Sequence, residues 1–81
     1  MTTTRNFNFG LYFIMEDGYR DFVASFNNAN AAEKAAKTTL SENNMIGCEY
    51  VITIDVNGET VNSLYYVSFN GKDFSLKYYS I

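Results

Sequence analysis

The sequence contains no histidine, no proline and no tryptophan, and its only cysteine is Cys48. The absence of histidine removes the commonest general base and metal ligand, and it excludes the pairs in which histidine activates a serine or cysteine nucleophile. A single cysteine cannot form an internal disulfide, so the chain lacks the framework typical of small secreted domains. These absences predict a protein with no catalytic, cofactor-binding or metal-binding residues.

Carboxylates are the remaining candidates for catalysis, and Glu16, Asp17 and Asp21 cluster near one predicted turn. Glycosidase-type chemistry needs two carboxyl groups that face each other across a cleft. A flat sheet with one helix offers little cleft, so we expect that the protein is not an enzyme. Cys48 falls on an inward position of a predicted strand, where cysteine usually acts as a small buried hydrophobic residue.

Length and charge place the protein among small, mildly acidic domains. The chain has 81 residues and a net charge of −3, which argues against a large nucleic-acid footprint. No run approaches the roughly 20 apolar residues of a membrane span, and the first ten residues lack the apolar core of a signal peptide. We therefore expect a single domain over residues 1–81, no membrane partner, and a cytoplasmic location.

Three Asx-Gly dipeptides, Asp17-Gly18, Asn57-Gly58 and Asn70-Gly71, punctuate strand-like runs. Such dipeptides favour two-residue type I′ turns, because both central residues need a positive φ. Each turn predicts a register. The key pairs are Phe13 with Phe22, Ile54 with Val61, and Val67 with Phe74; farther from the turns lie Leu11 with Ala24, Phe9 with Phe26, Ile52 with Ser63, Tyr50 with Tyr65, Cys48 with Val67, Tyr65 with Leu76, and Ser63 with Tyr78.

The segment "NNANAAEKAAKTTLSENN" between the first and second hairpins is rich in helix-forming residues. Asn30 followed by Glu33 has the spacing of a capping box, and Asn28 is a competing N-cap. Ala32, Ala36 and Leu40 recur on one face of the predicted helix, and the small alanines would let it approach a sheet closely.

The predicted fold is therefore α+β, with the order ββαβββ: a five-stranded antiparallel sheet with one helix packed on one face. The strand order 2-1-5-4-3 and the order 2-1-3-4-5 both fit the sequence. The side chains expected to face the helix are Phe9, Leu11, Phe13, Phe22, Phe26, Tyr50, Ile52, Ile54, Tyr65, Val67, Phe74, Leu76 and Tyr78.

The other face of the predicted sheet has no second helix to cover it, yet it is rich in tyrosine and aliphatic residues. Exposed apolar patches with tyrosine are typical of protein interfaces. We expect this outer face to bind an intracellular protein partner or a second copy of the chain as a homodimer, with Tyr66 near its centre. The predicted partner-binding residues are Tyr12, Ile14, Val23, Val51, Leu64, Tyr66 and Tyr79.

An aromatic sheet face could also stack the bases of RNA or single-stranded DNA. Modules of that kind combine aromatics with basic residues, and here Lys72 and Lys77 are the only basic residues in the last three predicted strands. Nucleic-acid binding is therefore the alternative function rather than the leading one.

The three turns and the segment "NAAEKAAKTTL" belong to a small, acidic, cysteine-poor chain rich in Asn, Lys, Tyr and Phe. In size and build, over its whole length, the chain resembles small phage-encoded accessory proteins, including anti-CRISPR and antitoxin-like inhibitors. The resemblance implies a small inhibitor that covers the working surface of a larger host protein. It has no motif, so it assigns no functional residue.

Overall fold

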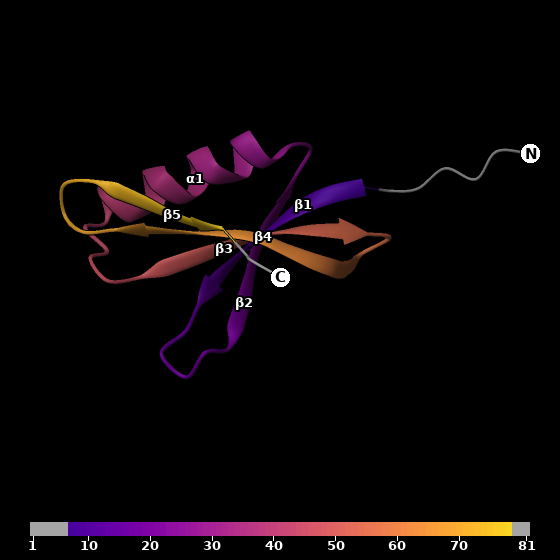
Figure 1. Ribbon diagram of the computed structural model, residues 1–81, viewed down its shortest axis with the longest axis horizontal. Helices are drawn as coiled ribbons and strands as arrows, with labels where there is room; N and C mark the ends of the chain where they lie inside the picture. Colours follow the sequence, from indigo (N-terminus) through magenta and orange to yellow (C-terminus); the bar gives the residue numbers. More distant parts are fainter. Residues whose placement is uncertain (1–6, 79–81) are drawn as a thin grey trace, which may run out of the picture.

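The computed structural model describes residues 7–78, in which five strands form one antiparallel sheet and one helix packs on it (Figure 1). The strand order is β2-β1-β3-β4-β5, which confirms the predicted α+β class and selects one of the two predicted orders. The elements are β1 (Phe7–Ile14), β2 (Arg20–Phe26), α1 (Ala29–Glu42), β3 (Glu49–Val56), β4 (Glu59–Phe69) and β5 (Phe74–Tyr78).

Helix α1 begins after Asn28, whose side-chain oxygen accepts a hydrogen bond from the backbone N–H of Ala31 at 2.8 Å. The competing prediction of Asn30 as the N-cap is wrong, because Asn28 already has the extended backbone of a cap and Asn30 lies inside the first turn. The predicted inward face is confirmed, with Ala32, Ala36 and Leu40 fully buried.

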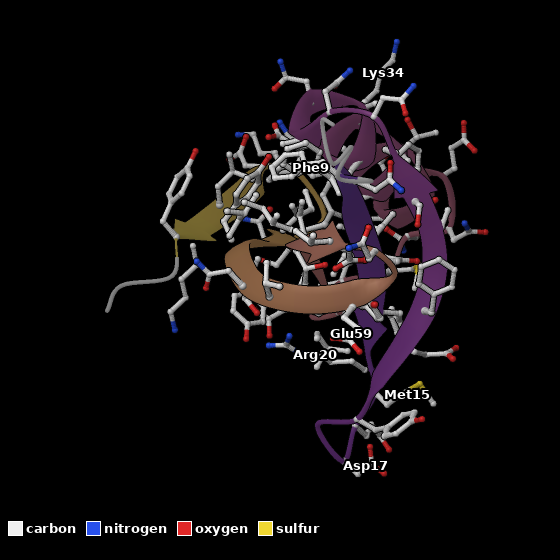
Figure 2. All side chains as sticks on the ribbon, turned by 90° about the vertical axis from the view of Figure 1, so that its right-hand side faces the viewer. Phe9, Met15, Asp17, Arg20, Lys34 and Glu59 are labelled. Atoms are coloured by element: carbon white, nitrogen blue, oxygen red, sulfur yellow. The ribbon has the colours of Figure 1, made fainter. Side chains whose placement is uncertain are left out.

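The core lies between α1 and the three central strands, and Figure 2 shows Phe9 in this layer with Lys34 on the far side of the helix. The small Ala32 and Ala36 side chains leave room for close packing against the fully buried Ile52 and Val67. The helix reaches β5 through Lys37, whose Nζ lies 5.6 Å from the centroid of the Phe74 ring, but it does not bury the strand. All of β5 is exposed, including the side chains that were predicted to face the helix: Phe74, Leu76 and Tyr78.

The first hairpin departs from the predicted register near its turn. Gly18 has a positive φ of 88° but Asp17 does not, so the turn is not type I′. The resulting one-residue shift is corrected by a β-bulge, in which Val23 of β2 has no opposite residue. Farther from the turn, Leu11 with Ala24 and Phe9 with Phe26 pair as predicted.

The predicted pairing of Phe13 with Phe22 is wrong. Phe22 lies on the turn side of the bulge, where the register is shifted by one residue, and is opposite Tyr12. Its ring packs edge-on against that of Tyr12 at 5.4 Å, whereas Phe13 packs against Tyr50 on the helix side. Phe22 and Phe13 thus occupy opposite faces of the sheet. The expectation that Phe22 faces the helix is corrected, while the order and direction of the strands are unaffected.

The second turn is type I′ as predicted, since Asn57 and Gly58 have positive φ values of 53° and 83°. The predicted partners beyond it are nevertheless wrong, because two irregularities give β4 two extra residues. Ile54 faces Asn62 instead of Val61, and the later pairs are Ile52 with Tyr65 and Tyr50 with Val67. Two extra residues restore the alternation, so Tyr65 and Val67 point inward as predicted.

The third turn is longer than predicted. Asn70 does not adopt a positive φ; its side-chain oxygen instead accepts from the backbone N–H groups of Lys72 and Asp73 at 2.9 and 2.7 Å. The loop therefore spans four residues, and Phe69 rather than Val67 lies opposite Phe74. The shift is two residues, so each side chain keeps its predicted face; the other pairs on that face are Val67 with Leu76 and Tyr65 with Tyr78.

A polar contact joins α1 to β4 at the edge of the core. The Tyr65 hydroxyl donates to Glu33 Oε1 at 2.7 Å, and Lys37 Nζ lies 2.8 Å from Glu33 Oε2. The hydrogen bond from Lys37 and then that from Tyr65 hold the pKa of Glu33 below its ordinary value of 4.5. Burial, followed by the hydrogen bond to Glu33, raises the pKa of Tyr65, so this hydroxyl stays protonated and donates.

We expect this contact to make stability depend on pH in the acid range. A carboxyl group whose pKa is lowered by folding stabilises the native state above its unfolded pKa of about 4.5 and loses that contribution as the pH falls further. Urea unfolding between pH 7 and pH 3 should show that Glu33→Gln is less stable than the wild type at pH 7 and that the difference shrinks below pH 4.5. The matched control is Glu42→Gln, an exposed carboxylate on the same helix. A difference that stays constant down to pH 3 would contradict the assignment.

Candidate functional site

The predicted partner-binding residues do not form one flat patch. Tyr12, Ile14 and Tyr66 lie half-buried on the outer face of the sheet, and Val23 is exposed at the bulge of β2. Val51 is also on this face, but it lies in register between Tyr12 and Tyr66 and is fully buried. Val51 therefore offers no surface to a partner.

Leu64 packs against the helix-side core, because the β4 irregularity between Ser63 and Tyr65 leaves it opposite no residue of β3 and turns it inward beside Tyr65. The prediction that Leu64 belongs to the outer face is wrong. Tyr79 lies outside the residues that the structure describes.

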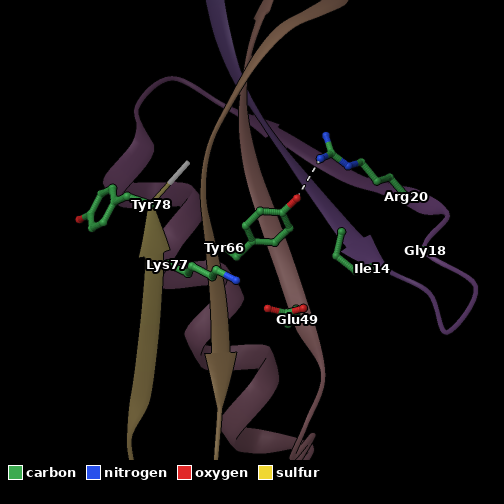
Figure 3. Close-up of a pocket in the computed structure, with 7 residues that line it drawn as sticks. All are labelled: Ile14, Gly18, Arg20, Glu49, Tyr66, Lys77 and Tyr78. Atoms are coloured by element: carbon green, nitrogen blue, oxygen red, sulfur yellow. Dashed lines mark hydrogen bonds between the residues drawn. The ribbon is translucent and has the colours of Figure 1, made fainter. Parts of the chain in front are cut away.

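Arg20 is the best-positioned charged group on the outer face, on the side of the sheet away from the helix (Figure 2). From the first position of β2 its guanidinium reaches across the sheet to β4. Its Nη1 donates to Ser63 Oγ at 2.9 Å and its Nη2 donates to the Tyr66 hydroxyl at 3.1 Å (Figure 3). Within residues 7–78 no carboxylate forms a salt bridge with Arg20. A guanidinium has five N–H donors, so these two bonds leave donors for a ligand.

A groove of about 610 Å³ opens beside this guanidinium. Arg20, Tyr66 and Lys77 line it, together with Ile14 and Glu49 (Figure 3). Two cations and one carboxylate give the groove a net positive charge on a protein whose overall charge is −3. The Tyr66 ring forms part of its wall, so the groove combines a fixed positive charge with an aromatic surface.

A second hollow, of about 660 Å³, continues the groove around the end of β1. The two hollows share Ile14, Gly18 and Glu49 in their linings. Met15 and Ile46 border the second hollow and are 42% and 56% exposed. Together the two hollows make a continuous surface with Arg20 and Lys77 in the first hollow and the exposed aliphatic residues in the second, where Glu16 and Glu49 add two carboxylates.

Beneath the outer face, at the other end of β3, lies a buried polar cluster around Asp55. Its Oδ1 accepts hydrogen bonds from the hydroxyls of Thr53 and Thr60, each at 2.8 Å. Because Thr60 donates its only hydroxyl hydrogen to Asp55, the Tyr12 hydroxyl is the donor in the 3.2 Å hydrogen bond between Tyr12 and Thr60. Thr53 is fully buried and Asp55 is 6% exposed.

Gly10 makes room for this cluster on β1. A Cβ atom at Gly10 would lie 2.5 Å from Asp55 Oδ2, 2.7 Å from Thr53 Oγ1 and 2.9 Å from a ring carbon of Tyr12. No side chain fits there without displacing one of these groups. The cluster holds Tyr12 in place next to Val51 and so helps to shape the outer face.

The described part of the chain has no group of three or more Cys, Asp or Glu side chains placed to hold a metal ion. It also has no helix long and apolar enough to cross a membrane. Comparisons with protein-family models, curated proteins and solved structures give no match. The groove must therefore be interpreted from its own geometry.

Sequence reasoning missed the residues that define the groove and the buried cluster. Arg20 and Ser63 carry no local signal, because their contact depends on irregularities in β2 and β4. Gly10 did carry one: an isolated glycine within a strand pattern often marks a close approach of neighbouring groups. Asp55 and Thr53 are two residues apart on one strand, and this spacing places both on the same face of the sheet.

Proposed function

We propose that the protein is a non-enzymatic interaction module that binds a larger protein through the outer face of its sheet and inhibits or modulates it. The observation that carries this proposal is Arg20, which Ser63 and Tyr66 fix in the groove while no described carboxylate forms a salt bridge with it. A guanidinium held in this way is positioned to donate two hydrogen bonds to a carboxylate of a partner.

The aliphatic residues of the second hollow favour a protein as the ligand. Met15 and Ile46 offer exposed aliphatic area beside the charged groove. A central charged or aromatic anchor with apolar neighbours is the usual composition of an interface hot spot. The proposal includes an intracellular partner, which suits a chain with one cysteine, and the inhibitor role that the resemblance to phage accessory proteins implies.

We expect partner binding to weaken at least about tenfold in Arg20→Gln, because truncating one member of a desolvated charge pair usually costs 2 kcal/mol or more. Tyr66→Phe keeps the ring but removes the hydroxyl that holds Arg20, so it should weaken binding less. The matched control is Lys34→Gln, which removes the same charge from the far side of α1 and should leave binding unchanged (Figure 2).

The experiment is affinity capture from the producing cells with the wild type and the three variants, followed by calorimetry with the purified partner. The proposal requires a protein that the wild type and Lys34→Gln capture and that Arg20→Gln loses. Equal capture by all variants, or no specific capture by any of them, would reject the groove as the binding surface.

A second candidate function is the binding of single-stranded RNA or DNA, and the favouring observation is that Arg20, Tyr66 and Lys77 line one groove. A base could stack on Tyr66 while the cations contact phosphates. Glu49 in the same groove and Glu16 in the adjoining hollow oppose a phosphate backbone, which carries a charge at every nucleotide, more than they oppose a single partner carboxylate on Arg20. Fluorescence anisotropy with labelled oligonucleotides distinguishes the candidates: binding that survives physiological salt and is lost in Lys77→Glu would favour nucleic acid over protein.

A further inference from the structure

The two edges of the sheet differ in how they are protected against pairing with another strand. Edge strands usually carry charges, a bulge or a proline that discourages such pairing. The outer edge of β2 has charged Arg20 and Asp21 at its start and a bulge at Val23. The other edge, β5, pairs with β4 without any irregularity, and Lys77 is its only charged residue.

The helix-facing side of β5 is only partly covered: Lys37 Nζ of α1 lies 5.6 Å from the centroid of the Phe74 ring, yet all five residues of β5 remain exposed. Phe74, Leu76 and Tyr78 alternate along it and are 36%, 37% and 66% exposed. Their inner neighbours on the sheet continue the apolar surface, since Phe74 packs on Phe69 and Tyr78 packs on Tyr65, each with ring centroids 5.0 Å apart. Figure 2 shows β5 as the strand at the rim of the sheet, beside rather than under the helix.

We propose that β5 pairs with β5 of a second copy, antiparallel about a two-fold axis at Leu76, to form a continuous ten-stranded sheet. In this register Leu76 meets its own copy, and Phe74 of each copy lies opposite Tyr78 of the other. The apolar strip is therefore complementary to itself, as a two-fold interface requires. On the outer face Ser75 lies opposite Lys77, so the two lysines do not face each other directly.

The size of the strip sets the strength of the dimer. The exposed parts of the three side chains amount to roughly 300 Å² per copy, at about 200 Å² for a complete aromatic side chain. Two copies and the paired backbone remain below the roughly 1,200 Å² of a standard stable interface. The dimer is therefore weak and concentration-dependent.

A cysteine at the axis tests the register directly. Residues directly opposite each other in an antiparallel pair have Cα atoms about 4.5 or 5.5 Å apart, within the range that a disulfide spans. In a Cys48→Ala background, Leu76→Cys should cross-link rapidly to a covalent dimer under mild oxidation. Val61→Cys is the matched control, because Val61 is a 60% exposed aliphatic residue on β4 away from this edge. Equal cross-linking of both variants would overturn the register.

Sedimentation equilibrium from 10 μM to 1 mM tests the association itself. The wild type and Val61→Lys should dimerise, whereas Leu76→Lys should stay monomeric because two ammonium groups would meet at the axis. A wild type that is monomeric at 1 mM, or a Leu76→Lys variant that dimerises like the wild type, overturns the proposal. Should Leu76→Lys fail to fold by circular dichroism, the cysteine cross-link still decides. The groove residues are unchanged in these variants, so failure of the dimer leaves the proposed protein binding to be judged separately.

Discussion

Gly10→Ala should lower the free energy of unfolding by about 3 kcal/mol, although it adds only one methyl group. The new Cβ would lie less than 3.0 Å from atoms of three side chains: Asp55, Thr53 and Tyr12. None of them can yield cheaply. Asp55 is tied by two hydrogen bonds, Thr53 is β-branched and fully buried, and the Tyr12 ring rests on Phe22.

The matched control is Gly18→Ala, in the first turn. A Cβ atom there meets nothing within 4 Å, but the positive φ of 88° strains any L-residue. The cost at Gly18 should be about 1 kcal/mol, so the comparison separates crowding from backbone strain. Urea unfolding followed by circular dichroism measures both. Gly10→Ala with the stability of the wild type would show that the Asp55 cluster moves aside freely.

Asp55→Ala should destabilise the fold by a similar amount, about 3 kcal/mol. The substitution removes the acceptor of two hydrogen bonds and leaves the hydroxyl of the fully buried Thr53 without its carboxylate. Asp55→Asn retains an acceptor oxygen and should lose less. Asp21→Ala is the control for removal of a carboxylate from an exposed strand position, and it should change stability by under about 0.5 kcal/mol.

Combining the two sites checks that they act on one cluster. If the methyl group added by Gly10→Ala clashes chiefly with the carboxylate, this substitution should lower the free energy of unfolding less in the Asp55→Ala background than in the wild type. Additive effects would locate the clash elsewhere. An Asp55→Ala variant as stable as the wild type would mean that the desolvation penalty of this carboxylate equals the stabilisation from its hydrogen bonds.

The alternation of side chains along the strands was predictable, but the pairing along them was only partly so. Asn57-Gly58 adopts the expected turn, yet Ile54 does not pair with Val61, because β4 is irregular there. These irregularities have no recognisable signal in the sequence. The predicted inward orientation of Tyr65 and Val67 is correct, because the register shifts in β4 total two residues. The predicted inward orientation of Phe22 is wrong, because a register shift of one residue moves a side chain to the other face of the sheet.

The candidate groove could not be predicted, because its lining residues come from all five strands. Tyr66 was correctly placed on the outer face from its position in β4. Its partner Arg20 lies on β2, and only the curvature and bulges of the sheet bring the guanidinium to within 3.1 Å of the tyrosine hydroxyl. The sequence of a strand defines the two faces of its residues but not how far a sheet bends to bring distant strands together.

The position of β1 between β2 and β3 also determines which pairing in the sheet is slowest to form. The β1–β2, β3–β4 and β4–β5 pairs are hairpins, which close locally on a timescale of about 1–10 μs. The β1–β3 pair joins strands separated by all of β2 and α1, so it carries most of the entropic cost of loop closure. Chain synthesis completes β1, β2 and α1 before β3 emerges, and until then the inner edge of β1 has no strand to pair with.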